Sequence, residues 1–185
     1  MPDLLADYPR PHAAYHELLD AQGQVRPHWR RLLDQLQRST PAQLQQRQAT
    51  LARQIQENGV TYNVYADPKG ADRPWELDLL PHVLAAEEWQ QLSAGIAQRA
   101  RLLNAVLADL YGPQRLIKEG LLPAELVFGH NNFLWPCQGI QPPDGAFLHL
   151  YAVDLARTPD GRWWVTADRT QAPSGAGYAL ENRTI

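Results

Sequence analysis

The sequence has a single cysteine, Cys137, among its 185 residues. No internal disulfide can therefore form, which agrees with a reducing compartment. The apolar runs are far shorter than the roughly 20 residues that a membrane-spanning helix needs. The first residues carry acids where a signal peptide needs bases, and no long apolar segment follows them. We therefore expect a cytoplasmic protein with no membrane contact.

The chain also lacks any block of like charge, and its formal net charge is −3. A surface that binds nucleic acid requires clustered lysine and arginine, so we expect no nucleic-acid partner. Hydrophobic residues make up 44% of the chain and charged residues 20%, which is typical of a folded globular protein and argues against disorder. Fifteen prolines predict many turns and short elements, and six tryptophans need a core or a partner surface.

Helical signals dominate residues 11–59. Apolar residues repeat at helical spacing in residues 15–19 and again after Pro27. A further helix is predicted to begin where the hydroxyl of Ser39 or Thr40 precedes a proline, and to end at Asn58-Gly59.

Signals for strands appear after this region. Residues 60–65 alternate in the manner of a β-strand, and residues 67–70 have the composition of a turn. A long amphipathic helix is predicted over residues 87–111, because one face is apolar and Gly-Pro follows. Residues 147–155 and 163–167 are predicted as two strands joined by a Thr-Pro-Asp-Gly turn.

The fold class that these elements indicate is α+β. We expect an N-terminal helical region over residues 1–59, followed by a mixed α/β lobe over residues 60–185 that ends in an antiparallel β-hairpin.

Two carboxylates mark the open end of the predicted hairpin. Antiparallel pairing about the turn would bring Asp154 and Asp168 to the same end, where they could share Mg²⁺, an ion that prefers oxygen ligands. The alternative is structural: Asp168 pairs with Arg157, Arg169 or Arg183, while Asp154 caps a turn. The spacing alone favours the structural alternative.

A small, glycine-containing segment follows the hairpin. The backbone amides of Ser174, Gly175 and Gly177 could approach an anion closely. No Gly-Lys-Ser/Thr follows, and a third glycine is missing, so neither a P-loop nor a dinucleotide fingerprint is present. On pattern alone, a simple glycine turn is the favoured alternative. The chain also has no Gly-x-Ser-x-Gly, and neither a hydrolase nor an oxidoreductase has motif support.

Several short motifs occur in an informative order. They are residues 75–81, 88–99, 109–112, 120–123 and 154–157, then Pro173-Ser174-Gly175 and finally Glu181-Asn182-Arg183. In this order the sequence resembles the circularly permuted ATP-grasp proteins of type 2, which are similar to the ligase domain of glutathionylspermidine synthase. The resemblance runs from about residue 15 to the last residue. Its most specific element is Pro-Ser-Gly-x-x-Tyr followed by Glu-Asn-Arg.

The resemblance implies ATP-dependent ligation, in which a small-molecule or peptide carboxylate is activated as an acyl phosphate and captured by an amine. It implies ATP and Mg²⁺ as cofactors. It also implies that the remaining C-terminal ATP-grasp lobes lie beyond residue 185, so we expect the chain to be the inactive N-terminal portion of a longer protein.

The resemblance also assigns residues to roles. Mg²⁺ would be held by Asp154 and Asp168. The groups facing phosphate or an acidic substrate would be Arg169, Ser174, Gly175, Gly177 and Arg183. No catalytic residue is assigned.

Three positions depart from the ligase pattern. Active ligases end the second hairpin strand with Glu, one intervening residue and Asn, and those positions are Ala167 and Arg169 here. A substrate-side arginine is replaced by Ala152. Arginine repels a metal cation, but its guanidinium can contact phosphate directly. The alternative hypothesis is therefore a non-catalytic, ATP-grasp-like binding or scaffold domain with an eroded metal site.

Overall fold

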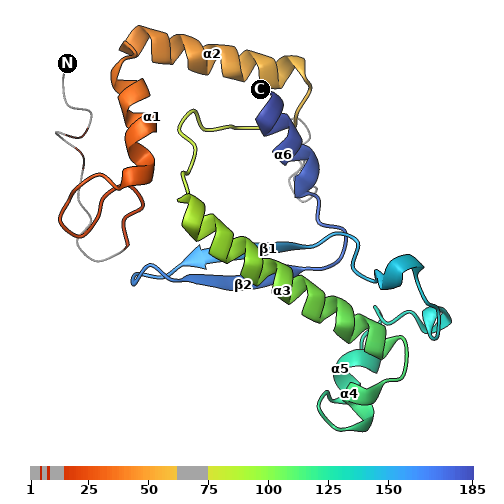
Figure 1. The fold of residues 1–185 in the computed structure, drawn as a ribbon. Coiled ribbons are helices and arrows are strands. Elements are labelled where there is room, and N and C mark those ends of the chain that lie inside the picture. Colours follow the sequence, from red (N-terminus) through yellow and green to blue (C-terminus); the bar gives the residue numbers. More distant parts are fainter. Residues whose placement is uncertain (1–4, 6–7, 9–14, 62–74) are drawn as a thin grey trace. The chain divides into compact units, whose positions relative to one another are not determined.

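The computed structural model describes residues 5, 8, 15–61 and 75–185 and has an α+β fold, which confirms the predicted class (Figure 1). The α-helices are α1 (Pro27–Gln37), α2 (Pro41–Glu57), α3 (Ala86–Leu110), α4 (Arg115–Lys118), α5 (Ala124–Phe128) and α6 (Gly175–Thr184). Two 3₁₀ turns, η1 (Trp135–Cys137) and η2 (Pro143–Gly145), precede the strands β1 (Ala152–Arg157) and β2 (Trp163–Arg169). The two strands pair with each other in one sheet.

The chain divides into two compact units, and most contacts between residues fall within one unit or the other. Unit 1 contains residues 1–85, 157–162 and 174–185, and unit 2 contains residues 86–156 and 163–173. The tip of the hairpin and α6 therefore belong with the N-terminal helices, whereas the body of the hairpin belongs with α3. The sequence boundary at residue 60 stays a prediction.

In unit 1, α2 begins where the sequence predicts. The hydroxyl of Thr40 accepts a hydrogen bond from the backbone N–H of Gln43 at 3.2 Å, and the Gln43 side chain accepts one from the N–H of Thr40 at 2.8 Å. This capping box satisfies two N–H groups that the first turn leaves unpaired, and Pro41 has no N–H to satisfy. The helix ends at Asn58, and Gly59 follows with a φ of +64°.

The predicted helix over residues 15–19 is wrong. His16 Nδ1 accepts hydrogen bonds from the N–H groups of Leu18 and Leu19 at 3.2 and 3.0 Å. Arg26 Nε donates to the carbonyls of His16 and Leu19 at 3.0 and 3.1 Å, and Leu19 forms an isolated antiparallel bridge with Val25. These side chains take the backbone groups that a helix would use, so the segment folds back as a turn.

The hairpin tip, also in unit 1, packs on this segment. Arg157 contacts Glu17 at 2.6 Å, and its guanidinium lies 4.3 Å from the centre of the Tyr15 ring. Arg26 lies at the same distance from that ring. Gly161 has a φ of +86°, and a Cβ atom there would stand only 2.6 Å from the Tyr15 ring. The turn therefore requires glycine both for its backbone conformation and for its close approach to the ring.

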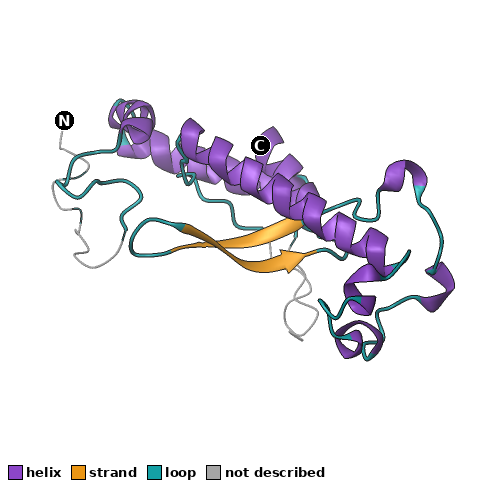
Figure 2. Cartoon of the chain, turned by 60° about the horizontal axis from the view of Figure 1, so that its bottom comes forward, coloured by secondary structure: helices purple, strands orange, loops and turns teal. Residues whose placement is uncertain are grey.

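In unit 2, the predicted long helix and the predicted hairpin are both confirmed. Helix α3 crosses the hairpin obliquely (Figures 1 and 2). Near one end of this contact, the Trp163 indole N–H donates to Glu88 Oε1 at 2.9 Å. The hairpin turn itself, which belongs to unit 1, closes through Thr158 N–H to the Arg162 carbonyl at 2.9 Å and Gly161 N–H to the Thr158 carbonyl at 2.8 Å.

The first strand is shorter than predicted, because it begins at Ala152 and not at residue 147. The side-chain oxygen of Asn104, on α3, accepts hydrogen bonds from the N–H groups of Phe147 and Leu148 at 2.8 and 3.0 Å. The Asn104 amide donates to the Gly145 carbonyl at 3.1 Å. The helix thus takes the backbone groups that an extended ladder would have used.

Of the residues that the structure describes, Leu19, Ile55 and Leu110 form the buried apolar set. Many large apolar side chains are exposed, including Leu126, Leu134 and Trp135. No helix in the described ranges is both long and apolar enough to cross a membrane. The strand predicted over residues 60–65 lies outside the described residues beyond Thr61, as does the turn predicted over residues 67–70.

Candidate functional site

The residues predicted for the site fall in both units. Asp154, Asp168 and Arg169 lie on the hairpin in unit 2, whereas Ser174, Gly175, Gly177 and Arg183 lie on or beside α6 in unit 1.

On the hairpin, Asp154 is paired with Arg169. Arg169 Nη2 donates to Asp154 Oδ2 at 2.7 Å, and Nε lies 3.0 Å from Oδ1. Hydrogen bonds from Arg169 lower the pKa of the Asp154 carboxyl below its ordinary value. Both side chains are exposed, at 61% for the arginine and 43% for the aspartate, so solvent can compete for either partner.

Asp168 has different partners. Arg99, on α3, donates from Nε and Nη2 to the two carboxylate oxygens, each at 2.6 Å, and the Tyr151 hydroxyl donates to Oδ1 at 2.5 Å. The bonds from Arg99, followed by the bond from Tyr151, lower the pKa of Asp168 to about 2. The same contact with Asp168 raises the pKa of Arg99. Partial burial raises the pKa of Tyr151, and its hydrogen bond to Asp168 adds to the effect.

The two ion pairs lie on opposite faces of the hairpin. Successive side chains of a strand point to opposite faces, so neighbours Asp168 and Arg169 face apart. Asp154 therefore lies on the face of Arg169, whereas Tyr151 lies on the face of Asp168. As they stand, each carboxylate is occupied by a guanidinium, and no three His, Cys, Asp or Glu side chains within the described ranges gather as a metal site. A magnesium site at Asp154 and Asp168 stays a prediction.

The structural alternative from the sequence was that Asp154 caps a turn, and this is wrong: Asp154 lies within β1 and pairs with Arg169. For Asp168, the alternative named Arg157, Arg169 or Arg183, and the observed partner is Arg99. Arg157 instead contacts Glu17 in unit 1. Sequence reasoning missed Arg99 and Tyr151 as members of this cluster, because nothing local connects them to Asp168.

The predicted glycine turn is the first turn of a helix. Ser174 precedes α6, and Gly175 and Gly177 lie in its first turn. Neither glycine has a positive φ, and a Cβ atom at either position would meet nothing within 4 Å. Neither backbone strain nor close packing thus accounts for glycine at these two positions. Their N–H groups belong to the free amides of a helix N-terminus, where anions bind favourably.

Another face of α6 packs on residues 58–61 and Trp75 of unit 1. The Trp75 ring packs against the Tyr178 ring with a tilt of 31° and ring centres 4.5 Å apart, and its indole N–H donates to Asn182 at 2.9 Å. The Tyr178 hydroxyl donates to the carbonyl of Thr61 at 2.9 Å, and the Asn58 amide donates to Glu181 at 3.3 Å. The Tyr and Glu-Asn positions of the motif therefore hold the helix in place. The motif order pointed to these positions but not to this role.

The sequence of the chain matches a known protein family. Residues 81–185 match the family model described as circularly permuted ATP-grasp type 2. The chain belongs to the circularly permuted ATP-grasp type 2 family. The family predicted from motif order is thereby confirmed. The similarity to glutathionylspermidine synthase stays a prediction.

The relatives are longer proteins. An uncharacterised protein of Mycobacterium tuberculosis is 42% identical over 183 residues, which cover 95% of this chain and 21% of that protein. One from Synechocystis sp. is 40% identical over 171 residues, covering 92% of this chain and 36% of that protein. One from Mycobacterium leprae is 36% identical over 170 residues, covering 92% and 30%. The chain therefore spans between 21% and 36% of the length of these relatives.

Proposed function

We propose that this ATP-grasp chain contributes to an ATP-dependent ligase that joins a carboxylate to an amine. Membership of the family supports the ATP-dependent class of chemistry. The observation that carries the role of this chain is the open first turn of α6, where Gly175 and Gly177 leave room for a ligand against the backbone.

In this proposal the N-terminus of α6 contacts a phosphate group. The free N–H groups and the partial positive charge at a helix N-terminus both favour an anion. The hydroxyl of Ser174 makes no capping hydrogen bond with the helix, so it can contact the same anion. Arg183, in the last turn of α6, would contact an acidic substrate group.

The two ion pairs of the hairpin, Arg169–Asp154 and Arg99–Asp168, also belong to the proposed site. Asp154 and Asp168 are the groups proposed to hold Mg²⁺, which would neutralise charge on a nucleotide's phosphates when bound. Because the two carboxylates lie on opposite faces of the hairpin, they would share one ion only after the end of the hairpin rearranged. Binding of the ion at Asp154 would require Arg169 to leave the carboxylate. Arg169 is then available to contact phosphate, so it would supply charge where other ligases have a metal ligand.

The proposed substrates and the remaining lobes of the enzyme follow from membership of the family. Small-molecule or peptide substrates would supply the acid and the amine. The lobes that grip ATP would lie in the further length that the relatives possess, and the 185 residues alone would turn over no substrate. We also propose a cytoplasmic location.

A second candidate function is a non-catalytic binding or scaffold domain. The ion pair between Arg169 and Asp154 favours this second function, because Arg169 stands at a position where a metal ligand is expected and engages the carboxylate of Asp154. In that case the open turn of α6 would still bind an anion, but magnesium would have no effect on it.

Backbone amide NMR of the 185-residue chain, titrated with ATP to millimolar concentration, tests the role of α6. We expect weak binding, with shifts that concentrate on Ser174, Gly175 and Gly177. Unchanged amide signals at these three residues would contradict the role. Inorganic pyrophosphate should reproduce the shifts and adenosine should not, because the contact is with phosphate.

A further inference from the structure

Residues 75–79, in unit 1, alternate between two environments. The side chains of Trp75, Leu77 and Leu79 are half-buried, whereas those of Glu76 and Asp78 are exposed. A period of two is the signature of an extended backbone, in which successive side chains point to opposite sides. Residues 75–78 therefore have the form of a strand, with one apolar side and one acidic side. A bend follows at Leu79 and Leu80, where the Leu80 N–H donates to Asp78 Oδ1 at 3.0 Å.

This strand-like segment is not paired along its length. The N–H of Trp75 donates to the carbonyl of Val60 at 3.0 Å, which ties down one end. Within the described ranges, the backbone N–H and C=O groups from Glu76 to Leu79 make no hydrogen bond to protein. Unpaired backbone groups in an extended segment are a template on which another strand can pair.

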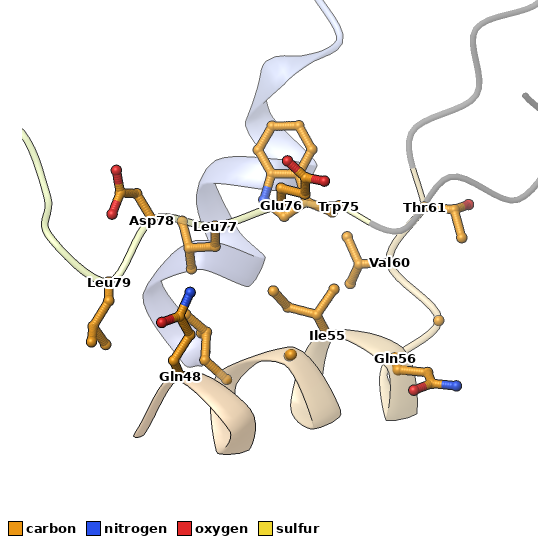
Figure 3. Close-up of a pocket in the computed structure, with 13 residues that line it drawn as sticks. Gln48, Ile55, Gln56, Val60, Thr61, Trp75, Glu76, Leu77, Asp78 and Leu79 are labelled. Atoms are coloured by element: carbon orange, nitrogen blue, oxygen red, sulfur yellow. The ribbon is translucent and has the colours of Figure 1, made fainter. Parts of the chain in front are cut away.

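A pocket of about 810 Å³ lies between this segment and α2. Its lining includes apolar residues of α2, among them Leu51 and Ile55, together with Val60. Figure 3 shows Ile55 and Val60 projecting from one side and Leu77 from the other into the same space. The pocket therefore offers room for an apolar side chain beside the unpaired backbone.

The charge on the opposite side of the segment is of one sign. Among the described residues that line the pocket, Glu76 and Asp78 are the charged ones. Both carboxylates point away from α2 in Figure 3. A strand paired here would place alternate side chains beside these carboxylates, where lysine or arginine is favoured and acids are repelled.

We propose that residues 76–79 are a docking edge for an extended peptide whose residues alternate between apolar and basic. Its backbone pairs with the free N–H and C=O groups, its apolar side chains enter the pocket above Ile55, and its basic side chains face Glu76 and Asp78. This docking edge does not rest on the proposed ligase function, since it requires neither nucleotide nor metal.

Fluorescence anisotropy with the 185-residue chain tests the docking edge. The probe is a labelled eight-residue peptide in which lysine alternates with leucine or valine. We expect saturable binding, and about tenfold weaker binding for a peptide with N-methyl groups on the edge that would pair, because main-chain hydrogen bonds are lost. A peptide of the same composition with its lysines in one block should also bind weakly. Equal binding of all three peptides would overturn the proposal, as would full competition by a short aliphatic diamine.

Two double charge-reversal variants distinguish binding at the docking edge from nonspecific electrostatic attraction of the peptide to the protein. Glu76→Lys combined with Asp78→Lys should abolish binding of the lysine peptide and create binding of its glutamate counterpart. The matched control is Glu87→Lys combined with Glu119→Lys, which makes the same change in net charge at exposed acids of unit 2. If the control weakens lysine-peptide binding as much as the edge variant does, the proposal is wrong. Thermal unfolding by circular dichroism checks that both variants fold.

Discussion

Arg99 and Asp168, 69 positions apart in the sequence, form a two-pronged ion pair in which both N–O distances are 2.6 Å. The parallel geometry matches the planar guanidinium to the carboxylate, which is the arrangement that arginine makes and lysine does not. Together with the hydrogen bond from Trp163 to Glu88, this pair holds the hairpin against α3. The carboxylate proposed for a metal site thus also contributes to the fold of unit 2.

The pKa of Asp168 should be close to 2, and its partners should account for that value. Carbon-13 NMR titration of the side-chain carboxyl measures it directly. Arg99→Gln should move the pKa furthest toward the ordinary value of about 3.9, and Tyr151→Phe should move it less, because arginine supplies the larger effect. A larger shift in the tyrosine variant than in the arginine variant would contradict this ranking.

The same pair makes the stability of the fold depend on pH in a defined direction. Because folding lowers the pKa of Asp168, its contribution is present above about pH 4 and is lost as the pH falls toward 2. The difference in urea midpoint between the unsubstituted chain and Asp168→Asn should therefore shrink across this range. High salt should reduce the difference at pH 7, because both side chains are solvent-accessible. A difference that grows on acidification would contradict the account.

Gly161 should tolerate alanine poorly. Its positive φ strains any other residue, and the new Cβ atom would lie 2.6 Å from the Tyr15 ring. We expect Gly161→Ala to lower the free energy of unfolding by about 1–3 kcal/mol, measured by urea denaturation. Gly139→Ala is the matched control, since Gly139 also has a positive φ, at +80°, but a Cβ atom there meets nothing within 4 Å. Equal losses in the two variants would show that the contact with Tyr15 adds nothing.

Trp75 should hold α6 through its ring and its indole N–H. Trp75→Phe keeps an aromatic ring for Tyr178 but removes the donor to Asn182, and we expect a loss of about 1 kcal/mol in unfolding free energy. Trp75→Ala should cost more and should also raise amide hydrogen exchange in α6. Asn182→Ala, measured alone and together with Trp75→Phe, completes a double-mutant cycle. Fully additive losses would mean that the two side chains do not interact.

Replacement of Arg169 tests the proposed link between this residue and magnesium. Arg169→Asn frees the Asp154 carboxylate and restores the amide of the usual ligase pattern, so we expect millimolar Mg²⁺ to shift the Asp154 signals in this variant and not in the unsubstituted chain. Thr166→Asn is the control, because it adds an amide to the same strand without removing the ion pair. No magnesium response in the arginine variant would remove Asp154 from the proposed metal site.

Sequence rules that use only neighbouring residues correctly predict several elements of the fold. The Thr40-Pro41 start of α2, the long helix α3 and the turn around Gly161 follow from capping, periodicity and turn chemistry, and all three are present. Residues 15–19 also have helical spacing, but hydrogen bonds to His16 and from Arg26 override it. Those contacts form only after the chain has turned back, so no local rule contains them.

The sequence predicts which residues belong to the candidate site, but it does not predict which residues they contact. Motif order located Asp154, Asp168 and the start of α6. It could not show that Arg99 reaches Asp168, nor that Tyr178 and Asn182 hold α6, since these contacts join residues 69 to 117 positions apart. The glycine segment predicts a turn because two glycines weaken a helix, whereas in the structure α6 begins among them.

Isothermal titration calorimetry with ATP and Mg²⁺ tests the central claim most directly. The 42% identical Mycobacterium tuberculosis relative, which contains the further length, should be measured beside the 185-residue chain. We expect saturable, magnesium-dependent binding of ATP to the relative and much weaker binding to the 185-residue chain. No heat of binding from the relative at millimolar ATP would contradict the ATP-dependent function, and equally tight binding by both would contradict the division of the site between this chain and further lobes.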